Sequence, residues 1–289
     1  MTTAHANGIT IEYETIGSGE PLLLIMGLGG QLTDWPAEFV VELSEQGFEV
    51  IVFDNRDMGL STEFDWEPPS LRRSVIGGLT KRPLEVGYVL PDMADDAAGL
   101  LDGLGIGSAH VVGMSMGGMI AQQLTIDHPS KVRSLASIMS HTGDGRNGLA
   151  TVGVIRKTLR MEPPTRAEAP QRSVENFLLW AGPHFDPEEH LLRAKVSVER
   201  SFRPDGLARQ TAAVLSSPDR TAGLAGVTAP TVVIHGMLDT LVKPSGGVAT
   251  AKAIPGSRLV SYPDMGHDLA RPRWTEMIDE IRRNANRAA

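Results

Sequence analysis

Residues 110–118 read HVVGMSMGG, an apolar run followed by a serine that has glycines two positions before and after it. The run is typical of a buried strand, and the following residues have the pattern of a helix that ends near His128-Pro129. A sharp turn between strand and helix holds a serine in a strained conformation, and its neighbours have to be small so that the two elements can approach. This context predicts that Ser115 is a nucleophile at the end of a strand.

A serine hydroxyl is a weak nucleophile until a base takes its proton, so the chain also has to supply a histidine and a carboxylate. Asp239 directly follows the apolar run Thr231–Ile234, and His267 follows the extended segment Arg258–Tyr262. Both are therefore expected at the same sheet edge as the serine. We predict that His267 is the base and that Asp239 orients it and stabilises its charged form.

Other acidic residues lie near the same predicted edge. Asp144 follows the apolar run at 135–139 and is the alternative acid. Asp264 and Asp268 flank the predicted base, and we expect them to be its solvated neighbours. The motif context favours Asp239 over all three.

A tetrahedral intermediate needs two backbone N–H groups aimed at its oxyanion. Met116, the residue after the serine, is expected to supply one, and Leu28, in the glycine-rich turn at 27–30, the other. Glycines in that turn let the backbone approach a substrate closely. The substrate pocket is predicted to be lined by Gly27, Gly29, Met114, His141, Phe177 and Trp180.

The composition narrows the possible partners and cofactors. The formal net charge is −8, from 27 basic and 35 acidic residues, which disfavours nucleic acid and anionic lipid as partners. The absence of cysteine excludes disulfides, thiolate nucleophiles and cysteine-based zinc sites. Residues 1–8 lack the apolar stretch of a signal peptide, and no apolar run approaches the roughly 20 residues of a membrane span. We expect a cytoplasmic monomer or homodimer that binds neither membrane nor metal.

The order of the elements predicts an α/β fold. Apolar runs without alternation recur between amphipathic stretches, which indicates a mostly parallel sheet covered by helices on both faces. An opening hairpin at Ile9–Ile16, closed by Gly17-Ser18-Gly19, is expected to add an antiparallel edge. Residues 141–225 carry helix signals without strands, including a helix that Asp186-Pro187 begins. We therefore predict a core of residues 1–140 and 226–289 with a helical cap at 141–225.

These motifs, taken together, resemble the α/β-hydrolase fold family over nearly the whole chain apart from the cap. The segment DNRDMGLS at 54–61 is similar to the family's D-x-R-G-x-G-x-S turn, with Asp57 in place of the usual glycine. With Met26-Gly27 before the glycine-rich turn, the chain looks closest to actinobacterial hydrolases similar to aclacinomycin methylesterase. The resemblance implies ester hydrolysis through an acyl-enzyme, without metal or organic cofactor.

We therefore expect a serine carboxylic ester hydrolase that acts on a small or medium, largely apolar ester, including the methyl ester of a polyketide-like acid. Three other enzyme activities remain open from the sequence: carbon–carbon bond hydrolysis, lactone hydrolysis and cofactor-free perhydrolysis. A ligand receptor that keeps a slow hydrolase site is the alternative from a different class. The intact motifs favour the enzyme.

Overall fold

The computed structural model describes residues 2–80, 84–160 and 162–288, which contain one eight-stranded sheet in the order β1-β2-β4-β3-β5-β6-β7-β8. Strands β3 to β8 run parallel to one another, while β1 and β2 are antiparallel to their neighbours. The strands are β1 (Thr2–Ala6), β2 (Ile9–Gly17), β3 (Glu20–Ile25), β4 (Phe48–Phe53), β5 (Ala109–Met114), β6 (Val132–Ile138), β7 (Thr231–Gly236) and β8 (Arg258–Tyr262).

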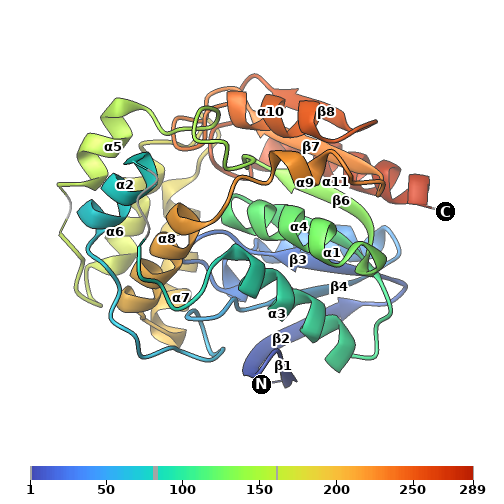
Figure 1. Ribbon diagram of the computed structural model, residues 1–289, viewed down its shortest axis with the longest axis horizontal. Helices are drawn as coiled ribbons and strands as arrows, with labels where there is room; N and C mark the ends of the chain where they lie inside the picture. Colours follow the sequence, from blue (N-terminus) through green and yellow to red (C-terminus); the bar gives the residue numbers. More distant parts are fainter. Residues whose placement is uncertain (1, 81–83, 161, 289) are drawn as a thin grey trace.

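Helices cover both faces of this sheet, which confirms the predicted α/β fold class (Figure 1). The α-helices are α1 (Ala37–Glu45), α2 (Leu71–Thr80), α3 (Leu90–Gly103), α4 (Met116–Asp127), α5 (Val152–Thr158), α6 (Ala169–Phe177), α7 (Pro187–Arg200), α8 (Pro204–Ser216), α9 (Thr221–Leu224), α10 (Ser245–Ala253) and α11 (Trp274–Ala285). Short 3₁₀ turns occur at Leu32–Asp34, Pro129–Lys131, Arg271–Arg273 and Asn286–Ala288.

The apolar strands are buried on both faces, as runs without alternation predict. In β3, Leu23 and Ile25 pack with helices α3 and α4, whereas Leu22 and Leu24 pack with α1 and α11 on the other face. Successive side chains of a strand point to opposite faces, so one apolar run contributes to the hydrophobic core on each face of the sheet. The sheet is thereby fixed between two helical layers, and its strand ends are rigid supports for loops.

The opening hairpin differs from the prediction. Its turn is Asn7-Gly8, where both residues have positive φ (48° and 77°), and it joins β1 to β2. The predicted turn at residues 17–19 instead leads from β2 to β3, and β2 pairs with β4. The predicted strand and its antiparallel pairing are confirmed, but the position of the hairpin turn was wrong, because β1 is a small, mostly exposed edge strand whose residues carry no apolar run.

Helices α5 to α9 lie between β6 and β7, and we call this part of the chain the α5–α9 segment. Asp186 caps α7, since its carboxylate accepts the backbone N–H groups of Glu188 and Glu189 at 2.9 and 3.0 Å. Figure 1 shows α5 to α8 gathered at one end of the sheet, together with α2. Helix α2, which packs on α8, was not predicted. The domain boundaries at 140/141 and 225/226 remain a prediction.

The loop after β4 is held by buried charges. Arg56 pairs with Asp96 of α3 at 2.6 Å. Asp57, at the position where the resembling turn has glycine, has a φ of 70°, and its carboxylate accepts the Tyr88 hydroxyl at 2.6 Å. Arg209 Nε of α8 lies 3.0 Å from the same carboxylate. The contacts with Tyr88 and Arg209 offset the energetic cost of a non-glycine residue in the left-handed backbone conformation.

None of the helices in the described ranges combines the length and the apolar character that a bilayer span needs.

The buried His110 of β5 gives a prediction for stability against pH. Burial, together with the charge of Arg133, lowers the pKa of His110 to about 4. The unfolded chain, with a histidine pKa of about 6.5, takes up a proton between pH 6.5 and 4 that the folded chain does not. His110 therefore does not lower the unfolding free energy above pH 6.5. As the pH falls from 6.5 to 4, the unfolding free energy decreases. His110→Gln should reduce this loss by up to about 3 kcal/mol.

The measurement is urea unfolding at pH 4.5, 5.5, 6.5 and 7.5. His5→Gln, at an exposed position of β1, is the control for the loss of a histidine as such. If His110→Gln has the same dependence of unfolding free energy on pH as the wild type, His110 is not a source of the acid sensitivity.

Candidate active site

Ser115 lies on the turn between β5 and α4. Its φ of 56° and ψ of −120° are in a region that non-glycine residues rarely adopt. Its backbone N–H donates to the Ile138 carbonyl of β6 at 2.9 Å, which holds the turn against the sheet. Met116 is the first residue of α4, and the first N–H groups of a helix have no acceptor within it. The hydroxyl therefore sits at a partly exposed helix N-terminus.

The glycines around Ser115 are required by close backbone contacts. A Cβ on Gly117 would lie 1.9 Å from the Ile25 carbonyl oxygen of β3, and one on Gly113 would lie 2.1 Å from the Gly117 carbonyl oxygen. A Cβ on Gly118 would lie 2.7 Å from Ser140 Cβ. Any side chain at Gly113 or Gly117 would separate α4 from the strands beneath it.

Asp239 lies on the loop after β7. Its Oδ1 accepts the backbone N–H groups of Leu241 and Val242 at 2.9 and 2.8 Å, so the carboxylate has a fixed direction. The loop is tied to the one after β8, because the Leu238 N–H donates to the Met265 carbonyl at 3.0 Å. A Cβ on Gly236 would lie 2.3 Å from that same carbonyl oxygen. The two loops can meet only because residue 236 has no side chain.

His267, on the loop after β8, joins the other two residues. Its Nδ1 lies 2.6 Å from Asp239 Oδ2, and its Nε2 lies 2.9 Å from Ser115 Oγ. Because an ionised carboxylate only accepts hydrogen bonds, Nδ1 carries the proton and Nε2 presents its lone pair to the hydroxyl. This arrangement can remove a proton from Ser115 and return it to a leaving group.

The Asp239 carboxyl remains ionised although it is 3% exposed. Burial by itself raises its pKa, but the positive charge of His267 in its protonated form and hydrogen bonds from His235, His267 and the Val242 N–H outweigh burial and lower the pKa below its ordinary value. His235 Nε2 lies 3.5 Å from Asp239 Oδ2 and donates to the Val242 carbonyl at 2.7 Å. Asp239 is therefore a stable negative charge beside the imidazole.

Residues 179–182 of the α5–α9 segment form hydrogen bonds with the loops after β7 and β8. The His267 N–H donates to the Trp180 carbonyl at 2.7 Å, and the Thr240 hydroxyl donates to the Leu179 carbonyl at 2.8 Å. Asp268 Oδ1 accepts the Gly182 N–H at 2.7 Å. The imidazole of His267 is thus positioned by its own side-chain partners and by the backbone of a segment far away in the sequence.

The expectation that Asp268 is solvated was wrong. Asp268 is 6% exposed, and Oδ1 also accepts the Gly266 N–H at 3.0 Å. Burial raises the pKa of Asp268, and the two backbone hydrogen bonds offset part of this rise. Asp264 is half-buried and pairs with Arg273 at 2.9 Å. The alternative acid Asp144 binds the backbone of its own loop, at Arg146 and Asn147.

The glycine-rich turn lies against Ser115. A Cβ on Gly27 would be 3.3 Å from Ser115 Cβ, and the Gly30 N–H closes the turn on the Gly27 carbonyl at 3.2 Å. Leu28 is 41% exposed at the tip of this turn. Leu28 and Met116 thus lie on the two backbone segments that flank the serine, as an oxyanion site requires. Their use as donors remains a prediction.

The structure brings only some of the predicted pocket residues to the serine. Gly27 and Met114 adjoin it, whereas Gly29 lies against Leu207 of α8, where a Cβ would be 2.7 Å from Leu207 Cδ1. Phe177 stacks on Phe185 and contacts the tilted ring of His190 within the α5–α9 segment, and Trp180 reaches the site through its carbonyl oxygen.

His141 Nδ1 accepts the Gly143 N–H at 3.0 Å. Burial, together with the charge of Arg220, lowers its pKa to about 4, so it is neutral at pH 7. The pocket roles of His141, Phe177 and Trp180 stay predictions.

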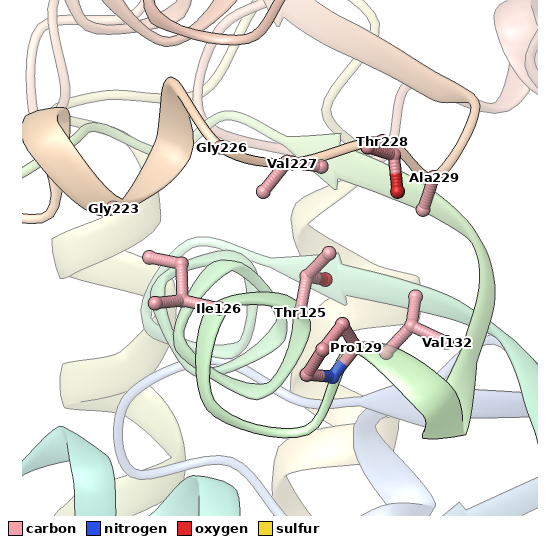
Figure 2. A pocket seen from close by; sticks show the side chains of 9 residues that line it. All are labelled: Thr125, Ile126, Pro129, Val132, Gly223, Gly226, Val227, Thr228 and Ala229. Carbon is pink, nitrogen blue, oxygen red and sulfur yellow. The ribbon is translucent and has the colours of Figure 1, made fainter.

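A cavity of about 240 Å³ lies at the other end of α4 (Figure 2). Thr125, Ile126, Pro129, Val132 and Val227 are among the nine residues that line it, and none of the nine is charged or a histidine. The helical rise places it about 15 Å along α4 from Ser115. Across the described ranges, no group of three or more histidine, aspartate and glutamate residues forms a possible metal site.

Several contacts of the site were not found from the sequence. Thr240, Asp268 and Gln210 form hydrogen bonds with residues far away in the sequence, and nothing near them indicates these partners. Asp268 adjoins His267, yet its partner Gly182 lies 86 residues away. Only knowledge of where the α5–α9 segment packs could have identified these residues.

Comparisons with known proteins agree with this fold. Residues 20–270 match the alpha/beta hydrolase fold family. Rhodomycin D methylesterases of Streptomyces sp. (strain C5) and Streptomyces peucetius are 28% and 29% identical, over 288 and 284 residues, and each match covers 90% of both chains. The enol-lactonase from Burkholderia xenovorans LB400 superimposes with a TM-score of 0.74 at 23% identity, covering 99% of this chain and 100% of the other. The predicted fold and the resemblance to methylesterases are confirmed.

The glycine contacts give a prediction for stability. Gly117→Ala should lower the unfolding free energy by about 3 kcal/mol or more, because its methyl group has to displace the backbone of β3. Gly107→Ala is the matched control, since Gly107 is exposed and a Cβ there meets no atom within 4 Å; it should change stability by less than about 0.5 kcal/mol. Urea denaturation followed by circular dichroism measures both. Equal midpoints would mean that α4 and β3 can separate freely.

Proposed function

This chain belongs to the alpha/beta hydrolase fold family and is an esterase-type hydrolase, and we propose that it cleaves carboxylic esters with Ser115, His267 and Asp239 as a catalytic triad. The observation that carries the proposal is the continuous hydrogen-bond chain from Ser115 Oγ to His267 at 2.9 Å and from His267 to Asp239 at 2.6 Å. The strained serine at a helix N-terminus supports it.

In the acylation step, Ser115 Oγ attacks the ester carbonyl carbon while its proton passes to His267 Nε2. The carbonyl oxygen becomes an oxyanion, which the backbone N–H groups of Leu28 and Met116 stabilise in this proposal. Asp239 stabilises the imidazolium, consistent with its lowered pKa. The alcohol leaves with the proton from His267, and the acyl group remains on Ser115.

In the deacylation step, His267 takes a proton from a water molecule, whose oxygen attacks the acyl carbon. The second tetrahedral intermediate collapses, the carboxylic acid leaves, and His267 returns the proton to Ser115 Oγ. All transferred protons move through one nitrogen, Nε2, because Nδ1 stays bonded to Asp239.

The substrate class follows from the surroundings and the relatives. We propose that residues 141–225 form a cap over the serine and that the substrate is a small or medium, largely apolar ester. Helix α8 of this part of the chain contacts the glycine-rich turn through Leu207 and Gln210, which supports the cap assignment. Because the two curated relatives are named methylesterases, methyl esters are the first class to test.

The test is hydrolysis of p-nitrophenyl esters from acetate to decanoate, and of methyl esters of apolar acids, at pH 8. We expect turnover by the wild type and a loss of about 10⁴- to 10⁶-fold in kcat for Ser115→Ala. A burst of p-nitrophenol equal to the enzyme concentration would report the acyl-enzyme. Ser140→Ala, which removes another buried hydroxyl next to α4, is the matched control and should keep the wild-type rate.

Two outcomes would contradict the proposal. Equal rates for the wild type and Ser115→Ala would show that another group is the nucleophile. A wild type that leaves every ester intact but cleaves vinylogous diketones or lactones would move the activity to one of those substrate classes, with the same serine.

A further inference from the structure

Gln210 of α8 connects the glycine-rich turn to the loop after β4. Its side chain is fully buried, and its Oε1 accepts the Gly29 N–H at 2.9 Å. Its Nε2 donates to the Arg56 carbonyl at 2.8 Å. One partner is a donor and the other an acceptor, so the orientation of the amide is determined by its surroundings. Both ends of the glutamine amide are therefore used.

The Gly29 N–H belongs to the peptide group that links Leu28 to Gly29. The orientation of this planar peptide group is set by ψ of Leu28 and φ of Gly29, so a hydrogen bond to it restricts the backbone at both residues. The turn needs such support, because Leu28 is 41% exposed, Gly29 has a φ of 73°, and three of the four residues at 27–30 are glycine. Glycine backbone has more conformational freedom to lose than any other residue.

The other end of the bridge is rigid. The Arg56 carbonyl belongs to the loop in which Arg56 pairs with Asp96 at 2.6 Å and the Asp57 carboxylate is bonded to Tyr88. Leu207, one helical turn before Gln210, lies against the α-carbon of Gly29. Helix α8 therefore holds Gly29 by a hydrogen bond and by packing, and it is itself anchored to the core.

We propose that Gln210 is a positioning residue that directs the Leu28 N–H toward the oxyanion formed on a Ser115-bound substrate. This inference rests on the proposed function and adds a residue from outside the sheet to it. The oxyanion exists in the tetrahedral intermediates and not in the bound ester, so the hydrogen bond from Leu28 strengthens along the reaction. Loss of Gln210 therefore lowers kcat and leaves KM nearly unchanged.

The test compares Gln210→Met, which keeps the length of the side chain and removes both hydrogen bonds, with Arg203→Met. Arg203, the N-cap of the same helix, donates to the Ser61 carbonyl at 2.6 Å and pairs with Glu63 at 3.3 Å, so its polar side-chain partners lie in the loop after β4 and not in the turn. It therefore controls for a weaker attachment of α8. The readouts are kcat and KM for p-nitrophenyl butyrate and the inhibition constant of an alkyl trifluoromethyl ketone, which forms an oxyanion with the serine.

We expect Gln210→Met to lower kcat by about 10- to 100-fold, less than the 10²- to 10³-fold that removal of an oxyanion donor causes. KM should change by less than threefold, and binding of the trifluoromethyl ketone should weaken by the same factor as kcat. Arg203→Met should change all three by less than threefold. Gln210→Asn, whose amide is too short to reach Gly29, serves if Gln210→Met does not fold.

Three results would overturn the proposal. The first is an unchanged kcat in Gln210→Met or, where that variant does not fold, in Gln210→Asn. The second is equal losses in Gln210→Met and Arg203→Met, which would assign Gln210 to general attachment of α8. The third is a rise in KM without a fall in kcat, which would assign it to substrate binding. Wild-type and Ser115→Ala rates on the same ester separate these results from a failure of the proposed function itself.

Discussion

The arrangement of the site depends on the close approach of α4 to β3 and β5. Gly117 lies so near the Ile25 carbonyl that even a methyl group there would overlap the strand. This proximity bends the chain sharply at Ser115 and forces its positive φ of 56°. The strain is borne by a sheet that is packed on both faces, so the serine is held outward at a fixed height above the strand ends.

Around the serine, the loops are fixed mainly by backbone hydrogen bonds to one another. The loops after β7 and β8 are joined by bonds such as Leu238 to Met265, and residues 179–182 bind both of them. On the opposite side of the serine, Gln210 binds the glycine-rich turn. The α5–α9 segment thus contacts both His267 and the glycine-rich turn, so the packing of this segment and the geometry of the site are coupled.

The fold, and the meeting of three side chains at one sheet edge, could be predicted from the sequence because their signals are local, while the catalytic roles of these side chains stay a prediction. Ser115 and Asp239 each follow an apolar run that indicates a strand, and His267 follows an extended segment; parallel strands bring such ends to one edge. Contacts between residues far apart in the sequence could not be predicted. Gln210 lies 181 residues from Gly29, and nothing near it in sequence indicates that contact. The edge strand β1 was missed because it needs only one neighbour and little apolar surface to form.

The contacts made by residues 179–182 use main-chain atoms on this segment: two carbonyl oxygens and one N–H group. Side chains at Leu179, Trp180 and Ala181 can therefore diverge over evolutionary time, or be randomised in a library, while the support of His267 is retained. Gly182 is the exception, since a Cβ there would lie 2.7 Å from the Gly266 nitrogen. The backbone support of His267 is thus largely independent of the side chains at positions 179 to 181, so substitutions there leave its hydrogen bonds in place.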